Sequence, residues 1–307
     1  MIDVKCAKSY RIQSAVPVLA GAPRIMPAAL PEFPPIVLCL AASDATGGGG
    51  LQADLLTLGS MGCHPLGVVT SVSVRDTRGV DDLLSIDPDV FALQARVVLE
   101  DIPVQAFKLG MCGGVENVAA VAEILSDYPD VPLVLEPALA CGPSDDAEAE
   151  DMVAALVELI LPQVTLLVTG RDEIVRLAGV DADEDDDSGP PLGPQEAAAR
   201  LIALGTEYVL LTGSAQPGAQ VVNRLISAEG VIRTDAWERL PGTFLGAGAT
   251  LSAAAAAALA HGMGVPEAVR EAQEFTQAAL AAAYRPGMGG AVPDRFFWAR
   301  PRDDDER

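Results

Sequence analysis

A glycine-rich segment that directly follows an apolar run is the first place where this sequence could bind a ligand. Residues 43–54 have the sequence SDATGGGGLQAD and lead into a stretch with helical spacing. Small residues let backbone amides approach a ligand closely, and a helix N-terminus favours negative charge. A dinucleotide motif would need glycine where Gln52 stands, and a Walker A loop would need a lysine after the glycines. The segment therefore predicts either another kind of ligand-binding turn or a plain strand-to-helix turn.

A second glycine-rich segment, PGTFLGAGATLS at 241–252, precedes an alanine-rich run that is typical of a buried helix. Gly246 and Gly248 permit tight turning, so the amides of Ala247, Gly248 and Ala249 could converge at the helix N-terminus. The sequence has three lysines and none after position 108, so backbone amides or arginines must bind anions there. The alternative is a helix that packs closely on a sheet, which small residues also permit.

Two weaker candidates accompany these segments. Asp54 follows Leu51 by three positions, so it would place one carboxylate on an apolar helix face. A buried carboxylate needs a partner, whereas a solvated one would complement the helix dipole, and the sequence leaves both open. Residues 211–218, LTGSAQPG, could cover a nucleotide or form a simple turn.

Short apolar runs alternate with helical patterns along the chain, which predicts a parallel sheet covered by helices. Strands are expected at 36–41, 66–72, 105–109, 133–136, 164–169, 208–212, 220–226 and 231–235. The last two are separated by a short turn, so we expect an antiparallel edge there. Apolar stripes at helical spacing begin at Leu51 and at Val118.

The chain divides into three parts on composition. Residues 1–34 are proline-rich without periodicity and predict a flexible extension, residues 35–290 predict one domain, and residues 291–307 predict a tail that is acidic at its end. The acidic, proline-containing stretch at 181–194 predicts a solvated loop within the domain.

Charge and cysteine content limit the function classes. The formal net charge of −23 disfavours nucleic acid and anionic membrane surfaces as partners. Five scattered cysteines without a C-x-x-C pair argue against a disulfide framework and favour a reducing, cytoplasmic environment. Prolines interrupt the mildly apolar stretch at 12–30, so we expect no membrane-spanning segment.

In their order along the chain, these segments resemble the hydroxymethylpyrimidine and phosphomethylpyrimidine kinases of thiamin biosynthesis, a branch of the ribokinase superfamily. The resemblance rests on SDATGGGGLQAD, on VVTSVSVRDTRGV at 68–80, on KLGM at 108–111 and on GAGATLSAA at 246–254. It implies a ribokinase-like three-layer α/β fold with a mostly parallel central sheet flanked by helices. It also implies ATP- and magnesium-dependent phosphoryl transfer to a small pyrimidine alcohol or its phosphate, and a possible homodimer.

The resemblance also implies roles for particular residues. The catalytic anion hole would consist of Gly246, Ala247, Gly248 and Ala249. The substrate would contact Ala42, Asp44, Gly49, Asp54, Arg75 and Met111, with Asp54 orienting the acceptor. Thr212, Gly213 and Glu173 would serve the nucleotide, and Glu173 would also serve the magnesium ion.

Four positions depart from the pattern of the family. Ala249 stands where the family has a cysteine near the acceptor oxygen, and alanine accepts no proton. Arg75 replaces a pyrimidine-reading glutamine, and because arginine only donates hydrogen bonds, it favours a more anionic or acceptor-rich ligand. Gly170 replaces the asparagine of an Asn-x-x-Glu motif, and Thr212 replaces a lysine of the nucleotide loop.

These departures leave three hypotheses open. The first is an ATP-dependent kinase of this kind, and the second is a catalytically impaired protein that binds a pyrimidine or another metabolite on the same fold. The third is a sugar-type kinase of the same superfamily, which a preference for a ribose-like ligand would select.

Overall fold

The computed structural model describes residues 33–142, 146–179, 192–213 and 216–300. Its compact unit begins at Pro34. Residues 1–32 of the extension expected at 1–34, and most of the acidic stretch at 181–194, lie outside the described residues. None of the described helices combines the length and the apolar character that crossing a bilayer requires.

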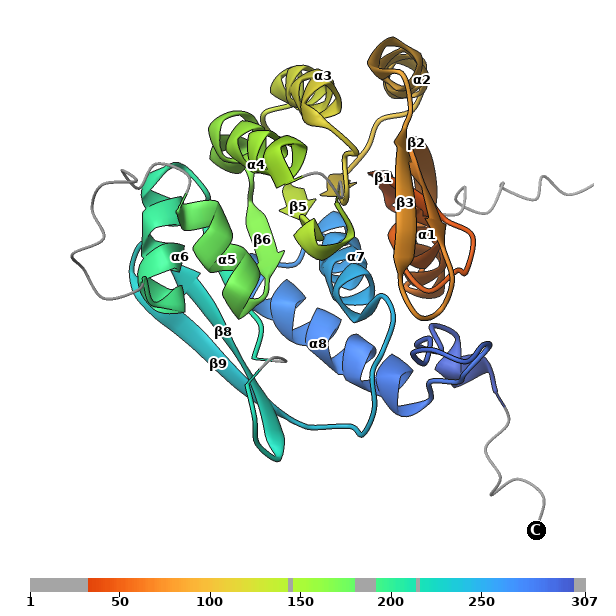
Figure 1. Cartoon of the computed structure of the whole chain (residues 1–307), viewed down its shortest axis with the longest axis vertical. Coiled ribbons are helices and arrows are strands. Elements are labelled where there is room, and N and C mark those ends of the chain that lie inside the picture. The colour runs from red at the N-terminus through yellow and green to blue at the C-terminus, as the bar shows by residue number, and fades with distance from the viewer. Residues whose placement is uncertain (1–32, 143–145, 180–191, 214–215, 301–307) are drawn as a thin grey trace, which may run out of the picture. The chain divides into compact units, whose positions relative to one another are not determined.

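A mostly parallel sheet forms the centre of this unit, in the order β3-β2-β1-β4-β5-β6-β7-β8-β9 (Figure 1). The strands are β1 (Ile36–Asp44), β2 (His64–Arg75), β3 (Val80–Ser85), β4 (Ala106–Leu109), β5 (Leu133–Leu135), β6 (Leu166–Thr169), β7 (Tyr208–Leu211), β8 (Gln220–Ser227) and β9 (Gly230–Glu238). β8 and β9 form the expected antiparallel edge. β3 was not predicted, and it adds a second antiparallel edge beside β2.

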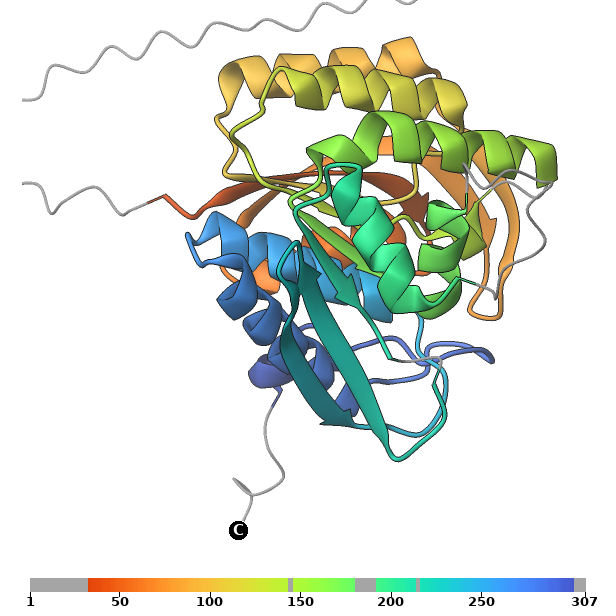
Figure 2. The ribbon, with the colours of Figure 1, turned by 90° about the vertical axis from the view of Figure 1, so that its left-hand side faces the viewer.

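Helices cover both faces of the sheet. They are α1 (Gly50–Ser60), α2 (Pro88–Asp101), α3 (Val115–Ser126), α4 (Asp146–Ala155), α5 (Arg171–Ala178), α6 (Pro194–Ala203), α7 (Ala247–Ala260) and α8 (Val265–Ala281). Figure 2 shows α7 on the side of the sheet opposite α2 and α3. The predicted three-layer α/β fold is therefore confirmed.

The alternation of side chains along the strands explains this layering. Leu38 and Leu40 of β1 belong to a core shared with α2 to α6, whereas Val37 and Cys39 belong to a second core shared with α1, α7 and α8. Successive strand residues point to opposite faces, so one apolar strand supplies both cores.

The alanine-rich helix α7 lies deep in the second core. Its residues Ala253 to Ala257 are fully buried, which is typical of a helix that is apolar on all sides. Alanine side chains are small, so α7 lies close to the sheet and to α1 and α8. This close packing fixes the N-terminus of α7 against the ends of the central strands.

Packed residues continue past the expected domain boundary at 290. Ala291, Val292, Asp294 and Arg295 are all buried. The tail predicted for 291–307 is therefore packed in its first part, and residues 301–307 lie outside the described residues.

Candidate active site

A cavity of about 230 Å³ lies where the carboxyl ends of β1, β2, β4 and β5 meet the N-terminus of α7. In open parallel sheets, ligands bind at this edge. The cavity brings together nine residues predicted from the sequence: Ala42, Asp44, Gly49, Arg75, Met111, Gly246, Ala247, Gly248 and Ala249. Ala42 lies at a register shift between β1 and β2, and such a shift re-aims the strand end.

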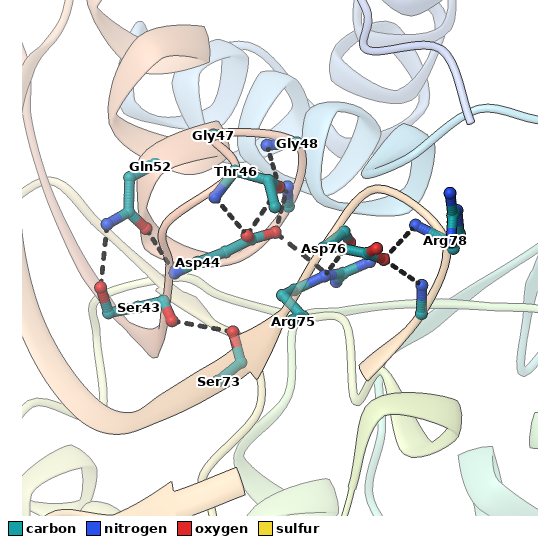
Figure 3. Close-up of polar contacts among 12 residues, drawn as sticks. Ser43, Asp44, Thr46, Gly47, Gly48, Gln52, Ser73, Arg75, Asp76 and Arg78 are labelled. Carbon is teal, nitrogen blue, oxygen red and sulfur yellow. Dashed lines mark hydrogen bonds and ion pairs between the residues drawn. The ribbon is translucent and has the colours of Figure 1, made fainter. Parts of the chain in front are cut away.

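Asp44 shapes the first glycine turn (Figure 3). Its Oδ1 accepts hydrogen bonds from Thr46 N at 2.9 Å and Thr46 Oγ1 at 2.7 Å, and its Oδ2 accepts one from Gly49 N at 2.9 Å. Gln52 also stabilises the end of β1, because its Oε1 accepts a hydrogen bond from Asp44 N at 2.7 Å. Asp44 is thus engaged mainly in holding the turn in shape, although it also lines the cavity.

Arg75 places a cation beside this turn. Its Nη1 lies 3.5 Å from Asp44 Oδ2, and its side chain is only 11% exposed. At the following turn, Asp76 Oδ1 accepts from Arg78 N at 2.6 Å and from Gly79 N at 3.2 Å (Figure 3). This arrangement fixes the end of β2, so Arg75 is held at the cavity wall.

The N-terminus of α7 faces the same cavity. Its first hydrogen bond runs from Thr250 N to Gly246 O, so the amides of the preceding residues are not used within the helix. Gly246 has a φ of +67°, and a Cβ atom there would lie 1.8 Å from Gly48 O. Only glycine fits such a contact. The two glycine-rich segments predicted from the sequence therefore meet at this point.

Arg295 joins these two segments. Its guanidinium donates to Gly47 O at 3.1 Å, to Gly48 O at 2.7 Å and to Thr250 Oγ1 at 3.1 Å. Burial lowers the pKa of Arg295 to about 10, which leaves it charged at neutral pH. Arg295 lies in the region expected to be a tail, and no local sequence pattern marked it as a site residue.

Asp54 does not line the cavity. It is fully buried, and its Oδ2 forms an ion pair with Lys108 Nζ at 2.9 Å. Of the two interpretations of Asp54, the structure therefore supports the buried carboxylate with a partner. Burial raises the pKa of Asp54 to about 6, while the charge of Lys108 lowers it. Lys108 itself lines the cavity, so Asp54 acts on that cavity through the lysine.

Glu136 is a second carboxylate in this network that the sequence analysis did not select. It directly follows β5, its side chain is 19% exposed, and its Oε2 lies 3.6 Å from Lys108 Nζ. A Cβ atom at Gly248 would lie 2.6 Å from Glu136 Oε1, so the carboxylate adjoins the first turn of α7. Burial raises the pKa of Glu136 to about 7, against the lowering effect of Lys108.

A second cavity, of about 430 Å³, lies on the other side of the α7 N-terminus, between β8, β9 and α8. Phe244, Ala247 and Gly248 line both cavities. Thr212 lines the second cavity. The amide of its neighbour Gly213 donates to Asn223 Oδ1 at 2.9 Å.

Glu173 and Gly213 are not among the residues that line either cavity in the described part of the chain. Both carboxylate oxygens of Glu173 accept hydrogen bonds, from Leu139 N at 2.9 Å and from Thr169 Oγ1 at 2.8 Å. Glu173 therefore fastens the loop after β5 to the end of β6.

The described residues contain no cluster of three or more His, Cys, Asp or Glu side chains that could hold a metal ion by themselves. Mg²⁺ at phosphoryl-transfer sites commonly uses one or two carboxylates together with phosphate oxygens and water. The carboxylates of the described residues form no independent metal cage, so a magnesium ion here would need phosphate oxygens of a nucleotide among its ligands.

The mostly parallel sheet flanked by helices, with two adjoining cavities at one glycine-rich helix N-terminus, agrees with the ribokinase-like α/β fold that the sequence resemblance implies. The family model for phosphomethylpyrimidine kinase matches residues 44–293. This chain belongs to that family.

Curated relatives agree over most of the chain. It is 34% identical to the hydroxymethylpyrimidine/phosphomethylpyrimidine kinase of Streptomyces coelicolor, over 88% of this chain and 97% of the relative. It is 37% identical to the protein of that name from Mycobacterium tuberculosis H37Rv, over 86% and 94%. Among solved structures, the ADP complex of Bacillus subtilis pyridoxal kinase is 27% identical with a TM-score of 0.74, over 87% of this chain and 99% of that one.

Proposed function

We propose that this protein is an ATP-dependent kinase that phosphorylates the hydroxymethyl group of an aminopyrimidine or the phosphate derived from it. One observation carries the proposal: Ala247 and Gly248 line both cavities. A phosphoryl donor in one cavity and an acceptor alcohol in the other would therefore meet at the first turn of α7. The names of the curated relatives supply the substrate class.

The two cavities would then have separate tasks. The smaller one, with Met111, Arg75 and the glycine turn, would hold the pyrimidine. The larger one, with Thr212, would hold ATP, and Gly213 and Glu173 would support it from outside the cavity. The amides at the first turn of α7 would bind the oxygens of the moving phosphoryl group, because preorganised donors stabilise charge that develops in transfer. Mg²⁺ bound with the nucleotide would neutralise further phosphate charge.

Arg75 refines the expected substrate. A guanidinium on the cavity wall favours acceptor groups, and its 3.5 Å contact with Asp44 engages one nitrogen of a group that has several N–H donors. We therefore expect the phosphorylated pyrimidine to bind more tightly than the unphosphorylated alcohol.

The decisive measurement is ATP consumption with hydroxymethylpyrimidine and with its monophosphate, for the natural protein and for Ala249→Cys. Turnover by the natural protein supports the kinase. No turnover in the natural protein together with turnover by Ala249→Cys would instead identify a binding protein whose scaffold remains intact. If both proteins fail to consume ATP with either pyrimidine, the proposed substrate class is wrong.

A further inference from the structure

Transfer of a phosphoryl group to an alcohol releases the hydroxyl proton, and a positioned side chain that takes this proton accelerates the reaction by about 10² to 10⁴-fold. Ala249 lines the smaller cavity and has no group that can do so. A side chain that takes the proton would therefore have to belong to another lining residue. The carboxylates among the lining residues are Asp44 and Glu136.

Asp44 is already engaged. Its two oxygens accept three hydrogen bonds from the glycine turn, and one of them also faces Arg75. Both oxygens of Asp44 are therefore occupied by the turn and by Arg75, and neither is free to approach a substrate hydroxyl. Cys141 also lines the cavity, but burial raises the pKa of its thiol, so the thiolate is disfavoured. Glu136 is the lining carboxylate whose Oε1 adjoins the α7 N-terminus.

We propose that Glu136 is the catalytic proton acceptor of this kinase and takes over the task that Ala249 cannot perform. The inference rests on the proposed function. As the substrate oxygen attacks the γ-phosphorus of ATP, its O–H bond breaks and the proton passes to Glu136. The bond between that phosphorus and the β,γ-bridging oxygen breaks, and ADP leaves with the electron pair.

The position of Glu136 suits this task. Its backbone amide donates to Leu109 O at 2.9 Å, which fixes the residue at the edge of the sheet. Its Oε1 lies next to Gly248, where the proposed phosphoryl path crosses from one cavity to the other. A general base must lie within hydrogen-bond reach of the reacting hydroxyl. The proposed phosphoryl path would bring that hydroxyl next to Glu136 Oε1.

Lys108 and Asp54 position the glutamate. Lys108 Nζ lies 3.6 Å from Glu136 Oε2 and 2.9 Å from Asp54 Oδ2, so the buried carboxylate of Asp54 fixes the lysine. The lysine engages Oε2, which leaves Oε1 on the side of α7. The other titratable groups that act on this region are Glu173 on α5, whose charge favours protonation of Glu136, and Cys141.

The acid–base properties agree with this geometry. Burial raises the pKa of Glu136 to about 7, and a general base works best when its pKa is close to the working pH. A carboxylate with an ordinary pKa would accept a proton less readily.

The test compares the natural protein with Glu136→Gln, Glu136→Asp and the double variant Glu136→Gln/Ala249→Cys. In each protein, kcat/KM for the pyrimidine alcohol is measured from pH 5.5 to 8.5 at several Mg²⁺ concentrations. Glu123→Gln is the matched control, because it makes the same change in an exposed carboxylate on α3 that pairs with Arg96.

We expect Glu136→Gln to lower kcat by about 10² to 10⁴-fold and to abolish the fall in kcat/KM below about pH 7. Ala249→Cys should restore activity in the double variant, with a different pH profile, and Glu136→Asp should keep a fraction of the rate. A role as a cation ligand would instead let high Mg²⁺ rescue Glu136→Gln, and that outcome would overturn the proposal.

Two further outcomes separate the inference from the proposed function. If Glu136→Gln keeps the rate of the natural protein and still loses kcat/KM at acidic pH, the protein is a kinase but Glu136 is not its proton acceptor. If neither the natural protein nor Ala249→Cys consumes ATP with a pyrimidine, both fall together.

Discussion

Lys108 Nζ lies 2.9 Å from Asp54 Oδ2 in the interior, and both side chains are at most 1% exposed. Neither group has a conventional hydrogen bond to any other partner in the described part of the chain. A buried ion pair contributes little by itself, but removing one member leaves an uncompensated charge. The two residues should therefore depend on each other for stability.

Lys108→Met is expected to lower the free energy of unfolding by about 3 to 5 kcal/mol, because Asp54 is left buried without its partner. The double variant Lys108→Met/Asp54→Leu should recover most of this loss. Urea denaturation at pH 7.5 measures both. Equal instability of the single and double variants would show that the lysine stabilises the fold through other contacts.

Much of this fold follows from the sequence, because most of the parallel strands contain a continuous apolar run between turn residues, and Lys108 interrupts the run in β4. Strand β3 could not be predicted from an apolar run, because Asp81 and Asp82 make it a polar edge strand. It found the glycine turns, whose composition is unusual by itself. It did not find the pairing of Asp54 with Lys108, because that contact requires α1 to cover the strand pair β1 and β4, and no local pattern specifies which strands are neighbours.

Gly248→Ala tests the contact between α7 and Glu136. The added methyl would lie 2.6 Å from Glu136 Oε1, so the carboxylate must move. We expect kcat/KM to fall by about 10²-fold, which corresponds to a displacement of roughly 1 Å at a catalytic group. Glu136→Asp in the same chain should recover part of the loss by giving the methyl room.

Gly59→Ala is the control for this substitution. Gly59 lies in α1 with open space around its Cα, so alanine there should stabilise the protein by about 0.5 to 1 kcal/mol and leave activity unchanged. A similar loss of activity in both variants would contradict the steric explanation.

Arg295→Met removes the guanidinium that joins the first glycine turn to α7. Three hydrogen bonds from a charged donor are lost, and the carbonyl oxygens of the half-buried Gly47 and the buried Gly48 lose a partner. We expect a loss of about 3 kcal/mol in the free energy of unfolding and a raised KM for both substrates. Arg270→Ala breaks an exposed pair with Glu274 and should cost no more than about 0.5 kcal/mol.

Arg75→Gln should reduce the preference for a phosphorylated pyrimidine. Glutamine keeps a donor and gains an acceptor, but it has no charge, so we expect the affinity ratio of phosphorylated to unphosphorylated ligand to fall by roughly tenfold. Isothermal titration calorimetry with both ligands, without ATP, measures this ratio. An unchanged ratio would place the phosphate away from Arg75.

Glu136 also predicts a dependence of stability on pH. Burial raises its pKa from the ordinary 4.5 to about 7, so between these values the folded protein binds more protons than the unfolded chain. This carboxyl therefore lowers stability as the pH rises through that window. Glu136→Gln lacks the effect, and the difference in unfolding free energy between the variant and the natural protein should move in favour of the variant from pH 5 to pH 7. Guanidinium denaturation at four pH values measures it.

The contacts of Arg295 have a consequence for synthesis on the ribosome. Gly47 and Gly48 are made early, but the side chain that fastens them to Thr250 is made almost 250 residues later. Every strand of the sheet and the whole of α7 leave the ribosome before Arg295 does. A nascent chain can therefore complete its sheet before the hydrogen bonds of Arg295 join the two glycine turns. The proposed ligand site would become fully assembled only near the end of translation.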